Sequence, residues 1–180
     1  GSCFPKDVKA LYKTAKDHNY DFQILNAVEK VNDSQKLKLV EKIQNHYKGN
    51  LKGKRFALWG LAFKPDTDDI REAPALEIIK QIIEAGASVV AYDPEAIPNT
   101  KKYFGDKSGL DFVEDEYKAL SDADALIIAT EWSQFRAPDF ELVKSKLKSA
   151  TIFDGRNLYN PATIKAKGFH YESIGREVVN

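Results

Sequence analysis

The feature that most constrains the fold is a regular alternation of short apolar segments with helical segments from residue 53 onward. The segment 125–129, Ala-Leu-Ile-Ile-Ala, is apolar on both faces, which is typical of a parallel strand covered by helices on either side. Strands that alternate with helices predict a doubly wound α/β domain. The expected strands are 55–60, 88–92, 125–130 and 151–154, with a weaker one at 111–113 and an edge strand at 170–174. The expected helices between them span 73–85, 114–120 and 140–147.

The first 50 residues follow a different pattern and predict a helical arm. Apolar residues recur at helical spacing from Val8 to Ala15, and Pro5 suits the first turn because its missing N–H would be unpaired there. A break is expected at 18–21, followed by a longer helix over 22–47. We therefore expect two parts, a helical arm over residues 1–50 and a Rossmann-like parallel-sheet domain over residues 51–180.

Composition narrows the class of protein. The chain has 27 Lys and Arg against 27 Asp and Glu, and this zero net charge argues against a general nucleic-acid binder. Its longest apolar runs are about five residues, far short of the ~20 that a membrane helix needs. A single cysteine excludes an intrachain disulfide, so the cytoplasm is the expected compartment. The absence of Met and the start at Gly1-Ser2 predict a trimmed chain or a piece of a longer protein.

Cations and aromatic rings follow several of the expected strands. Ligands of an open parallel sheet bind outside the carboxyl ends of its strands, where Lys64, Arg71, Arg136 and Arg156 are expected. Trp132 lies in one of these loops and is a candidate for ligand contact. Cations and aromatic rings at one edge of the sheet suit an anionic ligand with a flat ring, such as a nucleotide diphosphate. The alternative is that these cations are solvated loop charges.

Cys3 is a candidate nucleophile. It precedes a predicted helix N-terminus and has Lys6 one turn on, and both features favour the thiolate. The alternative is a small buried apolar residue, the usual role of a lone cysteine. Asp7 could serve as a base or merely favour the first helical turn. The three histidines lie far apart in the sequence without ligand spacing, so no metal site is predicted.

Two long motifs resemble those of a known family. Residues 1–11, Gly-Ser-Cys-Phe-Pro-Lys-Asp-Val-Lys-Ala-Leu, resemble the catalytic cysteine segment of the UDP-glucose 6-dehydrogenases. Residues 60–74 look like that family's second signature. Three shorter motifs, at 92–96, 130–132 and 153–156, follow in the family's order and spacing, so the resemblance covers the whole chain.

The resemblance implies a fold of three parts. An N-terminal Rossmann domain binds NAD, a central helical region builds a homodimer, and a C-terminal Rossmann-like domain binds the UDP-sugar. This chain would then be a C-terminal fragment that starts at the catalytic cysteine, without the NAD-binding domain. Its arm would belong to the central dimerisation region. The family's catalytic lysine and glycine-rich NAD loop have no counterpart here, and Gly60-Leu61-Ala62 is no dinucleotide fingerprint.

The resemblance also implies a reaction, the NAD-dependent oxidation of UDP-glucose to UDP-glucuronate for polysaccharide biosynthesis. Cys3 matches the nucleophile that captures the aldehyde as a thiohemiacetal, which is oxidised to a thioester. Asp7 matches an aspartate that positions water for hydrolysis of the thioester. The segment from Cys3 to Lys6 matches residues beside the nicotinamide, and Arg71 matches an arginine that reaches NAD.

The sugar-nucleotide site is implied by three further matches. Phe63 and Lys64 match a pair that contacts the UDP-sugar, and Arg156 matches an arginine of the same site. GDP-mannose or UDP-N-acetyl-mannosamine 6-dehydrogenases are the close alternatives, although the motifs at 4–7 and 130–132 favour UDP-glucose. A further alternative is a non-catalytic module that binds nucleotide sugars and dimerises. The fragment by itself is expected to be inactive.

Overall fold

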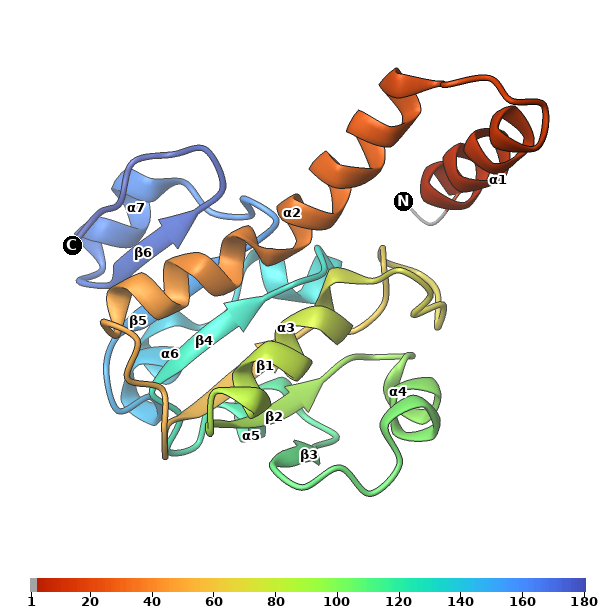
Figure 1. The fold of residues 1–180 in the computed structure, drawn as a ribbon. Coiled ribbons are helices and arrows are strands. Elements are labelled where there is room, and N and C mark those ends of the chain that lie inside the picture. Colours follow the sequence, from red (N-terminus) through yellow and green to blue (C-terminus); the bar gives the residue numbers. More distant parts are fainter. Residues whose placement is uncertain (1–2) are drawn as a thin grey trace.

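The computed structural model describes residues 3–180, with side chains from Lys6 onward, as a helical arm that leads into an α/β domain (Figure 1). The arm consists of α1 (Cys3–Asp17) and α2 (Gln23–His46), and the predicted break lies between them. The N-terminal half of α2 projects with α1 away from the sheet, while its C-terminal half lies across the sheet. Leu39, Val40 and Ile43 are buried there, so α2 is part of the domain core. The division of the chain at residue 50 therefore stays a prediction.

The domain is built on a six-stranded sheet in which every neighbouring pair of strands is parallel. The strands are β1 (Arg55–Trp59), β2 (Ser88–Tyr92), β3 (Leu110–Phe112), β4 (Ala125–Ile128), β5 (Thr151–Asp154) and β6 (His170–Ser173). Their order is β3-β2-β1-β4-β5-β6, so the direction of winding reverses between β1 and β4. The predicted α/β class and parallel sheet are confirmed.

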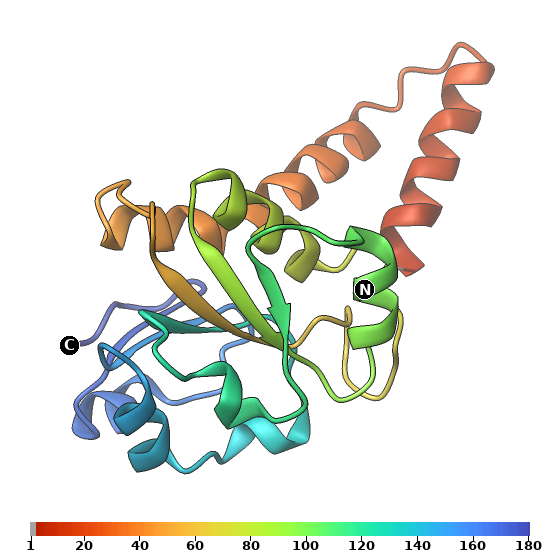
Figure 2. The same cartoon turned by 90° about the horizontal axis from the view of Figure 1, so that it is seen from below.

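Helices cover both faces of the sheet, as the apolar strands require. Figure 2 shows α2 and α3 on one side and α5, α6 and α7 on the other. Alternate residues of β1 enter two separate cores, with Phe56 and Leu58 under α2 and α3 and with Ala57 and Trp59 on the opposite face. The helices of the domain are α3 (Pro74–Glu84), α4 (Ile97–Phe104), α5 (Glu116–Ala119), α6 (Phe140–Lys146) and α7 (Pro161–Ala166), with a 3-10 turn η1 (Ser133–Arg136). The helices α4 and α7 and the turn η1 are not among the elements expected from the sequence.

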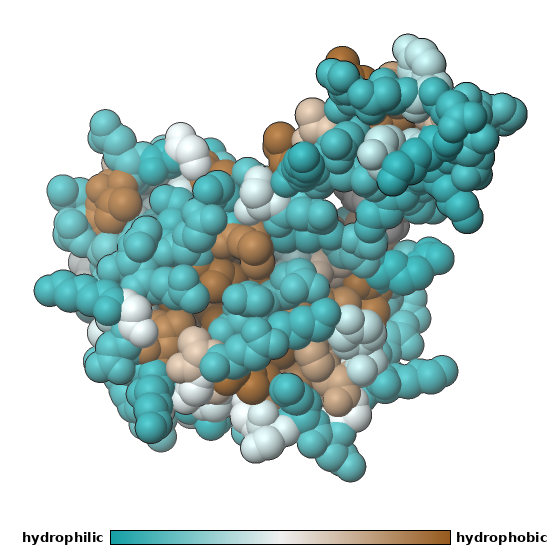
Figure 3. Space-filling model, in the orientation of Figure 1, coloured by the Kyte–Doolittle hydropathy of each residue, from teal (hydrophilic) through white to brown (hydrophobic). Residues whose placement is uncertain are grey.

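The projecting arm carries apolar side chains on its surface, visible as brown spheres (Figure 3). The exposed large apolar residues of α1, α2 and the turn between them are Leu11, Tyr20, Ile24, Val28 and Val31. In the described part of the chain, no helix combines the length and apolar character needed to cross a bilayer.

Candidate functional site

A cleft of about 450 Å³ opens at the carboxyl edge of the sheet, between α2 and the loops that follow β1, β4 and β5. Phe63 and Lys64 line it from the loop after β1, and Arg156 lines it from the loop after β5. Lys36 of α2 faces them across the cleft. The structure therefore brings together the three residues that the resemblance assigns to the UDP-sugar, and it adds a cation from the arm.

Asp93 connects the loops behind this cleft through hydrogen bonds. The carboxylate follows β2 and is 1 % exposed. Its Oδ2 accepts hydrogen bonds from the backbone N–H of Leu61 (2.7 Å) and Ala62 (3.2 Å) and from Nε1 of Trp132 (3.0 Å). Its Oδ1 accepts two more N–H groups from its own loop. Trp132, the candidate for ligand contact, is buried and its N–H is used by Asp93, so this role stays a prediction.

The ends of β1 and β4 approach each other closely beside these loops. Gly60 has a φ of 93°, and a Cβ at this position would lie 2.4 Å from Cβ of Thr130. The Thr130 hydroxyl donates a hydrogen bond of 2.6 Å to the carbonyl of Ala62. Only glycine satisfies both the backbone conformation and this contact, so the start of the loop that carries Phe63 and Lys64 is fixed.

Arg156 is held at the cleft wall by two carboxylates. The buried Asp154 accepts its backbone N–H at 2.8 Å. Glu131 pairs with its guanidinium, accepting from Nη2 at 2.7 Å and also from Nε. Burial opposes ionisation of Glu131, but the hydrogen bonds from Arg156 prevail and hold the pKa of this carboxyl below its ordinary value. A guanidinium has five N–H donors, so this pairing leaves donors for an anionic ligand.

A second cavity of about 530 Å³ lies beside the first and is lined by Lys6 of α1 and Arg71 of the loop before α3. Tyr103 of α4 contributes an aromatic ring to it. Asp69 accepts hydrogen bonds from the Arg71 guanidinium, which lower the pKa of this carboxyl. Lys6 and Arg71, two of the residues that the resemblance places near NAD, thus line one cavity.

The predicted catalytic residues lie on the first turns of α1. Cys3 is the first residue of this helix, but its side chain lies outside the described part of the structure. Asp7 is exposed, and within the described residues it lines neither cavity. The catalytic roles of both residues therefore stay predictions.

Lys36 and Glu72 form the wall that the two cavities share. Glu72 accepts hydrogen bonds from Lys36 of α2 and, at 3.0 Å, from Lys9 of α1. These two hydrogen bonds lower the pKa of Glu72, and the hydrogen bond between Lys9 and Glu72 raises the pKa of Lys9. Neither wall residue could be predicted from the sequence, because their importance depends on α2 lying beside the loop after β1.

We expect this ion-pair cluster to make stability sensitive to acid. The folded-state pKa of Glu72 is below its ordinary value of 4.5, so its contribution is present above that value and is lost as pH falls through the folded pKa. Glu72→Gln should lower the free energy of unfolding at pH 7, measured by urea unfolding. Between about pH 5 and pH 3, the free energy of unfolding should then fall less in the variant than in the wild type. The exposed Glu141 on α6 provides the control, Glu141→Gln. Identical acid dependence in all three proteins would show that the ion pairs do not stabilise the fold.

Two of the histidines lie together at the opposite edge of the sheet. The ring centroids of His46 and His170 are 4.2 Å apart, and Glu172 lies beside both rings. These histidines lie far apart in the sequence, which is why no metal site was predicted, and the end of α2 brings His46 beside His170 at the start of β6.

Comparison with known proteins agrees with the fold. Residues 57–161 match the UDP-glucose/GDP-mannose dehydrogenase family, UDP binding domain, and residues 1–34 match the central domain of that family. The chain is 43% identical over 176 residues to the UDP-glucose 6-dehydrogenase of Rhizobium meliloti. This match covers 98% of the chain but only 40% of the relative's length.

Solved structures with this fold include dehydrogenases for different sugar nucleotides. A UDP-glucose dehydrogenase from Pyrobaculum islandicum is 33% identical with a TM-score of 0.75, covering 87% of this chain and 34% of its own. An NDP-N-acetyl-D-galactosaminuronic acid dehydrogenase from Methanosarcina mazei is 26% identical with a TM-score of 0.77, covering 95% of this chain and 37% of its own. Because more than half of its residues match the UDP binding domain of this family, the chain belongs to the UDP-glucose/GDP-mannose dehydrogenase family.

Proposed function

We propose that this chain is the C-terminal part of an NAD-dependent UDP-glucose 6-dehydrogenase and forms the sugar-nucleotide half of its active site. The observation that carries the proposal is the cleft at the carboxyl edge of the sheet, where Phe63, Lys64 and Arg156 meet. A diphosphate requires fixed cations, which Lys64 and Arg156 supply. Phe63 adds an aromatic surface, and Nζ of Lys64 lies 5.4 Å from the centre of its ring.

UDP-glucose is the proposed substrate because of the sequence similarity that extends along the chain. The R. meliloti relative, which matches 98% of the chain, is a UDP-glucose 6-dehydrogenase. The motifs at 4–7 and 130–132 also favour this substrate. A GDP-mannose or UDP-N-acetyl-mannosamine dehydrogenase is the second candidate, since the fold is shared with enzymes for other sugar nucleotides.

The second cavity suits the edge of the dinucleotide cofactor. Lys6 and Arg71 offer positive charge for its phosphates, and Tyr103 offers a ring. NAD, when bound, would supply the hydride acceptor for both oxidations. Because Lys36 and Glu72 line both cavities, sugar and cofactor would approach each other across this pair.

The proposed chemistry at Cys3 is covalent capture of the aldehyde. Its position as the first residue of α1 favours the thiolate, because the N-terminus of a helix stabilises negative charge. The thiolate sulfur adds to C6 of the aldehyde, and the alkoxide takes a proton to give a thiohemiacetal. Oxidation of this carbon leaves a thioester. Water, positioned by Asp7, then cleaves the carbon–sulfur bond and releases UDP-glucuronate and the thiol.

The exposed apolar surface of the arm supports a homodimer in the whole enzyme. Ile24, Val28 and Val31 of α2 are exposed in a single copy, and a contiguous apolar surface of this kind favours association. The single cysteine of this chain cannot form an intrachain disulfide. The enzyme is proposed to act in the cytoplasm, where it would supply UDP-glucuronate for polysaccharide biosynthesis.

We expect UDP-glucose to raise the melting temperature of this chain more than NAD does, because the chain provides most of the sugar-nucleotide site and only the edge of the cofactor site.

Lys64→Ala and Arg156→Ala should each weaken UDP-glucose binding about 10- to 100-fold, the loss expected for one charge-assisted hydrogen bond. Isothermal titration calorimetry with UDP-glucose measures this effect.

Arg136→Ala is the matched control for these variants. Arg136 is an exposed arginine after β4, and in the described structure it does not line the cleft. Wild-type affinity in Lys64→Ala and Arg156→Ala would contradict the proposed site. Stronger stabilisation by GDP-mannose than by UDP-glucose would support the proposed site but would make GDP-mannose the substrate.

A further inference from the structure

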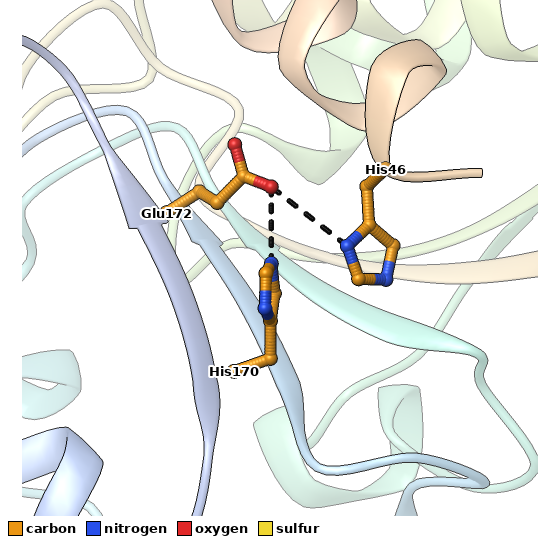
Figure 4. A group of neighbouring side chains, drawn as sticks. All are labelled: His46, His170 and Glu172. Carbon is orange, nitrogen blue, oxygen red and sulfur yellow. Dashed lines mark hydrogen bonds and ion pairs between the residues drawn. The ribbon is translucent and has the colours of Figure 1, made fainter. Parts of the chain in front are cut away.

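His46, His170 and Glu172 form a cluster (Figure 4). It lies at the amino edge of the sheet, because His170 is the first residue of β6. His46 is the last residue of α2, and the other two residues lie on β6. Oε1 of Glu172 is 3.0 Å from Nε2 of His170 and 3.8 Å from Nδ1 of His46. The three candidate ligand atoms all lie within 4.8 Å of one another.

These separations fit a shared metal ion. Zinc binds histidine nitrogen and carboxylate oxygen at about 2.0–2.2 Å, so neighbouring ligand atoms of a tetrahedral site lie about 3.3 Å apart. The two distances from Glu172, 3.0 and 3.8 Å, lie on either side of that value. Small rotations of the side chains would therefore place one ion in contact with all three.

The contacts of His170 are also compatible with a metal ion. Nδ1 of His170 pairs with Oδ1 of Asn180, and Nε2 lies 3.0 Å from Oε1 of Glu172. Either a ring proton or a metal ion can lie between Nε2 and this carboxylate oxygen. An outer hydrogen bond of this kind is the usual way to orient a metal-bound histidine.

The surroundings of His46 and Glu172 are compatible with the metal. Nζ of Lys42 lies 3.8 Å from Oε2 of Glu172, which leaves Oε1 for the ion. The three ligand side chains are 10 to 25% exposed, so an ion and a water molecule can reach them.

We propose that His46, His170 and Glu172 bind one divalent cation of the zinc class, with water in the fourth position. The ion would hold the last turn of α2 against β6. Its position at the amino edge makes it a stabilising site separate from the redox chemistry. Because α2 also lines the sugar-nucleotide cleft through Lys36, the metal would fix one wall of that cleft.

The test uses the 180-residue chain without a polyhistidine tag, stripped with EDTA and titrated with ZnCl₂. We expect one zinc per chain and a rise in melting temperature of roughly 5–10 °C at a hundredfold excess over the dissociation constant. Co²⁺ should give the visible absorption bands of a tetrahedral site. His46→Ala, His170→Ala and Glu172→Gln should each lose these effects.

His18→Ala is the matched control, because His18 is an exposed histidine in the turn after α1. It should bind zinc as the wild type does. Unchanged binding in the cluster variants, or an equal loss in His18→Ala, would overturn the proposal. If a cluster variant does not fold, the wild type is still informative: the absence of tetrahedral Co²⁺ bands, or a melting temperature that does not respond to zinc, would overturn the proposal.

Discussion

Replacing Asp93 by alanine should lower the free energy of unfolding by about 3–5 kcal/mol, a large fraction of the stability of an ordinary domain. The carboxylate is buried and accepts five N–H groups, two from the loop after β1, two from its own loop and one from Trp132. Each buried donor left without an acceptor costs about 1–3 kcal/mol, and water entering the space recovers part of this loss. Urea unfolding at pH 7 measures the difference.

The same substitution should also weaken UDP-glucose binding, although Asp93 itself lies behind the cleft. It orients the N–H groups of Leu61 and Ala62, and the next residues along the chain are Phe63 and Lys64. Asp93→Asn should lower the free energy of unfolding less than Asp93→Ala does, because the amide keeps one oxygen acceptor. It should still be destabilising, because the amide nitrogen turns two donors toward N–H groups. Asp106→Ala, at an exposed loop aspartate, is the control. A loss no greater than that of the control would show that Asp93 does not organise these loops.

The sheet could be predicted from the sequence because burial on both faces leaves a direct signal. Residues 125–128, Ala-Leu-Ile-Ile, are fully buried, and no surface strand would tolerate four apolar residues in succession. The longer helices were predictable for the related reason that their apolar residues recur along one face, as in α3. The helices α4 and α7 are short and polar, and each begins beside a proline that also suits a turn.

The candidate site was predictable only in part. The topological rule gathers the loop cations at one edge, and Lys64 and Arg156 do line one cleft. The rule does not say which polar side chains the protein uses for its own structure. Trp132 follows a strand as a ligand-binding residue would, yet its N–H satisfies a buried carboxylate on another loop.

Contacts between the arm and the domain could not be predicted from the sequence. Lys36 meets Glu72, and His46 meets His170, because α2 lies across the sheet. Periodicity shows which face of a helix is apolar but not where along the sheet that face is placed. The wall between the two cavities and the histidine cluster therefore appear only once the chain is folded.

In the whole enzyme, with an NAD-binding domain ahead of residue 1, replacing Cys3 by serine should reduce kcat about 10³-fold or more. The serine hydroxyl has no low-energy anion near neutral pH, so the aldehyde is not captured and the second oxidation has no thiohemiacetal to act on. The wild type should produce two NADH for each UDP-glucose, and this stoichiometry should be lost in the variant. UDP-glucose affinity should remain, because the sugar-nucleotide cleft is lined by other residues.

Asp7→Asn provides the comparison that assigns the steps. If Asp7 positions the hydrolytic water, this variant forms the thioester but cleaves it slowly, and mass spectrometry should detect a covalent adduct on Cys3 that the serine variant cannot form. The 180-residue chain offers an independent readout, because Cys3 is its only cysteine and alkylation therefore reports on this thiol alone. Iodoacetamide should react faster than with an unperturbed thiol at pH 7 and should leave UDP-glucose binding intact. Full turnover in Cys3→Ser would remove the thiol from the mechanism, whereas normal alkylation kinetics with lost turnover would mean that its activation requires the cofactor domain.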